Sequence, residues 1–86
     1  MTREEIASNV IAIFQKEFEV EHPALDDNLR EKYGFDSIDA IELLIKIEKM
    51  LGSELTQEEK KKALDIRTIN QICDYIESLA KARSLM

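Results

Sequence analysis

Residues 34–39, Gly-Phe-Asp-Ser-Ile-Asp, decide the fold, because a loop ends there and the longest apolar-rich stretch of the chain begins. Asp36 is placed to cap a helix, and Asp39 stands at the spacing from which a carboxylate reaches back to the capping residue. Ser37 falls in the first helical turn, where free N–H groups and the positive end of the helix dipole would stabilise a phosphate esterified to its hydroxyl. Gly34 permits the left-handed backbone that a sharp turn into a helix often requires.

Two interpretations of this motif are open at this point. An isolated Asp-Ser pair is usually an ordinary helix cap with no further role. The longer stretch 34–43, Gly-Phe-Asp-Ser-Ile-Asp-Ala-Ile-Glu-Leu, resembles the phosphopantetheine attachment site of the acyl carrier protein family. That site has a Gly-x-Asp-Ser-Leu/Ile core, followed by an apolar helix with a Glu near its start. The family's order of long helix, long loop, motif helix, short helix and final helix also fits residues 1 to about 82.

The resemblance implies that Ser37 carries a covalent 4'-phosphopantetheine arm and that Asp36 belongs to the same cofactor site. A phosphopantetheinyl transferase would attach the arm, with coenzyme A as the donor. In this family the terminal thiol of the arm holds acyl groups as thioesters. The function implied is therefore that of an acyl carrier protein for fatty-acid, specialised lipid or polyketide synthesis, served by acyl-loading and acyl-processing enzymes.

Capping boxes and apolar spacing predict four helices, at about residues 3–18, 37–51, 56 to 63 or 64, and from 68 or 69 onward. Beyond Lys81 the tail is expected to fray. The predicted fold class is all-α, a four-helix bundle of the acyl-carrier type with a long loop between helices one and two, in a single carrier domain of residues 1–86. The core is expected to include Ile6, Val10, Phe14, Leu43, Ile47, Ile69, Ile72 and Ile76.

The segment from residue 19 to 35 is predicted to be a loop. Pro23 disfavours helix at the residue before it, and several turn-forming residues follow. A loop this long in a small domain is usually functional or held in place. Four side chains are expected to anchor it by inserting into the core, namely Leu25, Leu29, Tyr33 and Phe35.

The helix predicted at 37–51 carries two apolar faces. The first, expected to face the core, consists of Ala40, Leu43, Leu44, Ile47, Met50 and Leu51. The second is an isoleucine stripe at spacings of three and four, formed by Ile38, Ile41 and Ile45. Either the helix is central and enclosed, or the isoleucine stripe is an exposed docking surface. Neighbouring acids favour docking, and the predicted partner-binding residues are Ile38, Asp39, Ile41, Glu42, Ile45 and Glu48.

Acidic residues are concentrated around the motif. The net charge is −6, and residues 17–42 hold nine acids against two cations, so that this stretch carries −7 and the remainder about +1. Nucleic-acid binding requires clustered Lys and Arg, and is therefore not expected. The pattern instead predicts partner enzymes with basic docking patches.

Length and hydropathy predict a monomer of one small domain. No run of about 18 apolar residues exists, so no membrane association is expected and a cytoplasmic location is predicted. Cys73 is the only cysteine and falls on an apolar helical face, which predicts a buried, reduced thiol.

Intrinsic catalysis is not expected. A catalytic serine needs a base, usually a histidine, and the only histidine, His22, lies in the predicted loop. His22 has no Cys or second His near it, and Glu31 stands where a calcium loop starting at Asp26 would need glycine, so no metal site is predicted. Two alternatives to a carrier are a helical adaptor, which would bind a partner through the isoleucine stripe without a prosthetic group, and a hydrolase, which the missing base disfavours.

Overall fold

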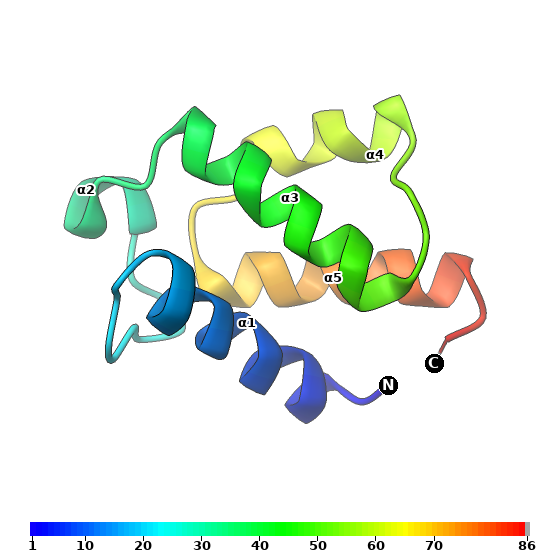
Figure 1. Cartoon of the computed structure of the whole chain (residues 1–86), viewed down its shortest axis with the longest axis horizontal. Coiled ribbons are helices and arrows are strands. Elements are labelled where there is room, and N and C mark those ends of the chain that lie inside the picture. The colour runs from blue at the N-terminus through cyan, green and yellow to red at the C-terminus, as the bar shows by residue number, and fades with distance from the viewer. Residues whose placement is uncertain (86) are drawn as a thin grey trace.

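The computed structural model describes residues 1–85, and the regular structure within them is entirely helical. Its elements are α1 (Arg3–Glu17), α2 (Leu29–Tyr33), α3 (Ser37–Leu51), α4 (Gln57–Lys62), the 3-10 turn η1 (Ala63–Asp65) and α5 (Ile69–Ala82). Helix α1 packs against α5, and α3 crosses this pair with α4 on its other side (Figure 1). The all-α prediction is confirmed, with one short helix more than expected. None of the helices in this part of the chain could span a membrane.

One hydrophobic core joins α1, α3 and α5. All eight residues predicted for it are buried, none more than 4% exposed. Cys73 lies in the same core as a free thiol, as predicted, and burial raises its pKa above the ordinary value. The amphipathic pattern of each long helix therefore identified the face that it buries.

Helix α2 corrects the prediction of an unbroken loop over 19–35. The side chain of Asn28 accepts a hydrogen bond from Glu31 N at 3.0 Å and so caps the helix, and Gly34 ends it at a left-handed φ of 66°. Its first residue, Leu29, is buried. A single turn is too short to show helical periodicity, so only the Asn and Gly at its ends could have indicated it.

The anchoring side chains of this segment follow the prediction only in part. Leu29 and Phe35 are buried and Tyr33 is half-buried, but Leu25 is 42% exposed, so its predicted insertion into the core is wrong. Residue 25 is held by its backbone instead, since its carbonyl oxygen accepts a hydrogen bond from Asn70 N at 3.0 Å.

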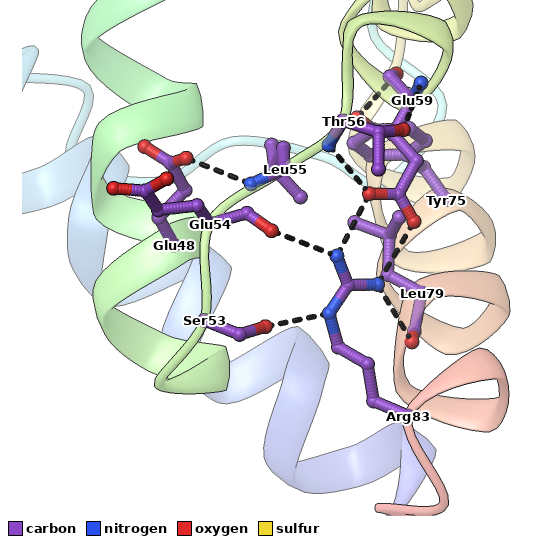
Figure 2. A network of polar contacts seen from close by, with 9 residues as sticks. All are labelled: Glu48, Ser53, Glu54, Leu55, Thr56, Glu59, Tyr75, Leu79 and Arg83. Carbon is purple, nitrogen blue, oxygen red and sulfur yellow. Dashed lines mark hydrogen bonds and ion pairs between the residues drawn. The ribbon is translucent and has the colours of Figure 1, made fainter.

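The end of α5 is bound to the connection between α3 and α4. Arg83 donates to Glu59 Oε1 at 2.7 Å, to Ser53 Oγ at 2.6 Å and to the carbonyl oxygen of Glu54 at 3.1 Å (Figure 2). The hydroxyl of Tyr75 donates to the carbonyl oxygen of Glu59 at 2.6 Å. For residues 82–85 the predicted fraying after Lys81 is wrong, because the Arg83 side chain ties this segment to α4 and to the chain before it. The last residue of the predicted tail, Met86, lies outside the described residues.

This arrangement predicts a pH dependence of stability. The Arg83 guanidinium, assisted by the backbone N–H of Thr56, lowers the pKa of Glu59 from 4.5 to about 2. A carboxylate whose pKa is lower in the folded state contributes stability above its unfolded pKa and loses that contribution as pH falls toward the folded value. We expect the melting temperature of the parent chain to drop more steeply between pH about 5 and about 2 than that of Glu59→Gln. Parallel pH profiles for the two proteins would contradict the ion pair's contribution.

The two termini of the described chain lie side by side. The amino group of Met1 donates to the carbonyl oxygen of Leu85 at 3.1 Å. Both lie at the end of the molecule away from the start of α3 (Figure 1).

Candidate functional site

Ser37 is the first residue of α3 and is exposed. The predicted capping box forms around it. Asp36 Oδ1 accepts hydrogen bonds from the backbone N–H groups of Ile38 and Asp39, both at 3.0 Å, and Asp39 Oδ2 accepts one from Asp36 N at 3.1 Å. These bonds use the side chains of Asp36 and Asp39 and leave the Ser37 hydroxyl without a hydrogen bond to any group in residues 1–85.

The residues before Ser37 are fixed from α1 and α2. The ring of Phe35 packs against the rings of Phe14 and Phe18, with centroid separations of 5.4 Å to each. Its backbone N–H donates to the carbonyl oxygen of Leu29 at 3.1 Å. The packing of these three rings and the end of α2 therefore fix the position of the loop just before Ser37, where α3 begins.

Ser37 lies on the walls of two hollows. The first is a cavity of about 130 Å³ between α3, η1 and α5. Most of its lining side chains are apolar and a few are polar: Arg30, Phe35, Asp36, Ser37, Ala40, Ile41, Leu43, Leu44, Ile47, Lys60, Ala63, Leu64, Ile66 and Tyr75. The second is an open hollow of about 400 Å³ beside the loop, lined by Arg30, Gly34, Phe35, Asp36 and Ser37. Neither hollow can be recognised from the sequence, because both depend on how α2 and η1 pack against α3.

The isoleucine stripe faces solvent. Ile38 is 73% exposed, Ile41 60% and Ile45 48%. Of the two interpretations of α3, the enclosed helix is wrong and the exposed stripe is present. Leu64 of η1, 62% exposed, lies across a groove of about 390 Å³ from Ile41 and Ile45 and extends the apolar surface. The sequence did not reveal this neighbour, because the position of Leu64 beside α3 depends on how η1 packs.

The acids predicted beside the stripe differ in whether their carboxylates already accept hydrogen bonds within the described chain. Glu42 is exposed, and no hydrogen bond or ion pair within residues 1–85 involves its side chain. Asp39 is occupied by the capping box. Glu48 Oε2 accepts a hydrogen bond from Leu55 N at 2.8 Å, so this carboxylate also holds the connection to α4. Glu42 is therefore the carboxylate most available to a partner along this side of α3.

Within residues 1–85, no histidine lines either hollow beside Ser37. His22 is exposed on the segment before α2, and no hydrogen bond joins it to Ser37 in the described chain. Residues 1–85 also contain no cluster of His, Cys, Asp and Glu suited to a metal ion. The arrangement can present a serine hydroxyl beside an apolar cavity, at a helix N-terminus that favours an attached anion.

Comparison with known proteins gives a consistent result. The family model described as the phosphopantetheine attachment site matches residues 8–76. Acyl carrier protein 2 of Ralstonia nicotianae is 33% identical over 84 residues, which cover 95% of this chain and all of that protein. An acyl carrier protein of Phytoplasma mali is 38% identical over 76% of this chain and 84% of its own length, and one of Lactobacillus johnsonii is 28% identical over 91% and 96%.

Proposed function

Since this chain belongs to the acyl carrier protein family, we propose that its phosphopantetheine arm is attached to the hydroxyl of Ser37. Proteins of this family are carriers and not catalysts, and the chain carries phosphopantetheine for acyl intermediates. Fatty acid synthesis is the process typical of the family. A helical adaptor without a prosthetic group does not fit this membership.

The observation that carries the proposal is the placement of Ser37 itself. Its hydroxyl is exposed and free of hydrogen bonds within residues 1–85, and it lies on the wall of both hollows at the start of α3. The site fits the group, because the first turn of α3 favours the phosphate and the open hollow leaves room for it. When bound, the arm supplies a thiol for thioester formation. The protein supplies only position and recognition.

The apolar cavity beside Ser37 suggests how the cargo is protected. An acyl group that enters it would exchange water for the side chains of Leu43, Leu44 and Ile47, which is favourable for any apolar chain. We therefore propose that this cavity shelters the apolar part of the acyl group while the carrier moves between enzymes.

The test of attachment is the intact mass of the protein. Incubation with coenzyme A and a phosphopantetheinyl transferase is expected to add one phosphopantetheine, and peptide mapping is expected to locate it at Ser37. Coenzyme A alone is expected to leave the mass unchanged, because no base in residues 1–85 is bonded to the Ser37 hydroxyl. Modification at Ser8, Ser53, Ser78 or Ser84 would contradict the assignment.

We propose that the transferase and the acyl-loading and acyl-processing enzymes recognise the exposed face of α3 that carries the isoleucine stripe. The isoleucine stripe offers apolar contact, and four acids border it, Asp36, Asp39, Glu42 and Glu48. Apolar burial would supply affinity, whereas the acids would mainly speed and orient the encounter with a basic patch. Membership of the family implies that the chain interacts with synthase and processing enzymes. We propose that these enzymes bind at the isoleucine stripe.

Two substitutions separate these contributions. Ile41→Ala removes apolar contact and is expected to weaken modification by the transferase to a similar extent at low and high salt. Glu42→Lys reverses an unpaired surface charge and is expected to slow association most at low ionic strength, where screening is weakest. Rates measured across a salt series, with circular dichroism as a control for folding, distinguish the two. Unchanged rates for both variants would place recognition elsewhere, with residues 19–35 the next candidate.

A further inference from the structure

Arg30 differs from the other arginines in having no partner within the described chain. The guanidinium groups of Arg3 and Arg83 form ion pairs, and that of Arg67 donates to two backbone carbonyl oxygens. The Arg30 guanidinium forms no hydrogen bond or ion pair within residues 1–85. On the same helix, Lys32 is paired with Asp27 at 3.3 Å. The planar guanidinium of Arg30 therefore has its N–H donors available for an anion.

Its position is fixed relative to Ser37. Arg30 is the second residue of α2, which Asn28 caps at one end and Gly34 terminates at the other. The backbone N–H of Leu29 donates to the carbonyl oxygen of Arg67 at 2.8 Å, which ties the start of α2 to the chain before α5. Arg30 and Ser37 both line the apolar cavity and both line the open hollow. Whichever of these an arm on Ser37 entered, Arg30 would be part of its wall.

A phosphodiester on Ser37 would lie close to two carboxylates as well as to the helix N-terminus that favours it. The carboxylates of Asp36 and Asp39 form the capping box on either side of the serine and would repel the phosphate. The helix N-terminus compensates in part. Lys60 is the other cation nearby, but it lines only the apolar cavity, whereas Arg30 lines both hollows.

We propose that Arg30 binds the phosphate of the phosphopantetheine arm, with its guanidinium donating to the phosphate oxygens. The inference rests on the proposed attachment at Ser37. Arginine suits this role because its planar fork matches the geometry of a phosphate. The contact would hold the first part of the arm on the α2 side of the site, at the mouth of the apolar cavity, rather than along the isoleucine stripe.

The experiment compares the apo and phosphopantetheine-loaded forms of the unmutated protein by nuclear magnetic resonance. Side-chain Nε–H signals of the four arginines are assigned in both forms. The Arg30 signal is expected to shift on loading and its exchange with water to slow, while the Arg67 signal stays in place as an internal control. An Arg30 signal that is the same in both forms would overturn the proposal.

Variants then test the contact from the phosphate side. In the loaded protein, Arg30→Gln is expected to change the ³¹P shift of the arm, and Arg30→Lys to change it less because the charge is kept. Lys32→Gln is the matched control on the same helix and is expected to leave the signal unchanged. A ³¹P change in Lys60→Gln alone would assign the phosphate to α4 and overturn the proposal.

Attachment at Ser37 and the contact with Arg30 can be contradicted separately. Intact mass and peptide mapping of each sample report whether Ser37 carries the arm, independently of the resonance measurements. An arm found on another residue overturns both the attachment and the Arg30 contact. An arm on Ser37 with no response at Arg30 overturns the contact alone.

Discussion

Ser37→Ala is expected to accept no phosphopantetheine, while its helical content stays close to that of the parent chain. The substitution removes the only oxygen through which an ester at this position can form. It leaves the cap of α3 intact, because the bonds to Ile38 N and Asp39 N come from the side chain of Asp36. Intact mass after incubation with coenzyme A and a transferase measures the first effect, and circular dichroism measures the second.

Ser78→Ala provides the matched control. Ser78 is also an exposed helical serine, but it lies on α5. This variant is expected to be modified like the parent chain. If Ser37→Ala still gained the mass of one phosphopantetheine, the attachment site would lie elsewhere. If Ser37→Ala lost its helical signal, the missing modification could result from unfolding and not from the missing hydroxyl. Modification would then be measured in Ser37→Thr, which keeps a hydroxyl, and in Ser37→Cys, which does not.

Ile47→Ala and Ile72→Ala are each expected to lower the free energy of unfolding by about 2 to 4 kcal/mol. Ile47 on α3 and Ile72 on α5 are both 0% exposed, so truncation removes buried surface and leaves a cavity. A small domain has a total stability of only about 5 to 15 kcal/mol, and losses of this size are a large share of it. Urea titrations followed by circular dichroism give the values.

Ile45→Ala is the control for these core substitutions. It removes the same atoms from the same helix as Ile47→Ala, but Ile45 is 48% exposed. Its cost should be small, within roughly half a kcal/mol for a surface position. Equal losses at Ile45 and Ile47 would mean that α3 does not bury the face described above.

The sequence was sufficient to predict those structural features that depend only on neighbouring residues. The helix starts were predicted from capping boxes, and those at Thr2, Asp36, Thr56 and Thr68 all form. Such a box needs only two side chains three residues apart, so neighbouring residues contain all the information. The core faces were predictable for a similar reason, since the helical period places them without knowledge of the partner helix.

Features that depend on distant parts of the chain were not predictable. Arg83 appeared to be part of a fraying tail, because nothing near residue 83 indicates that Glu59 lies within reach. Leu25 appeared to be a core anchor, yet Asn70 holds it through its backbone. Both errors come from contacts between residues more than twenty positions apart, which no local pattern records.

The candidate site divides in the same way. Ser37 and the isoleucine stripe follow from one helix and its cap, and so they could be identified from the sequence. The two hollows and the position of Arg30 require α2, which was expected to be loop. Glu48 was predicted only as a partner-binding residue, and its hydrogen bond from Leu55 N depends on the path of the chain after Gly52.

The contact between Met1 and Leu85 has a consequence for how the carrier can be tethered. A linker that leaves the molecule next to Met1 or next to Leu85 would start from the same side, away from the start of α3 (Figure 1). A fused protein or a solid support would therefore be attached on the side of the carrier away from Ser37, and the face around Ser37 would stay accessible. Joining the two ends with a short link would also close only a small gap, and the conformational entropy lost on closing a short loop is modest.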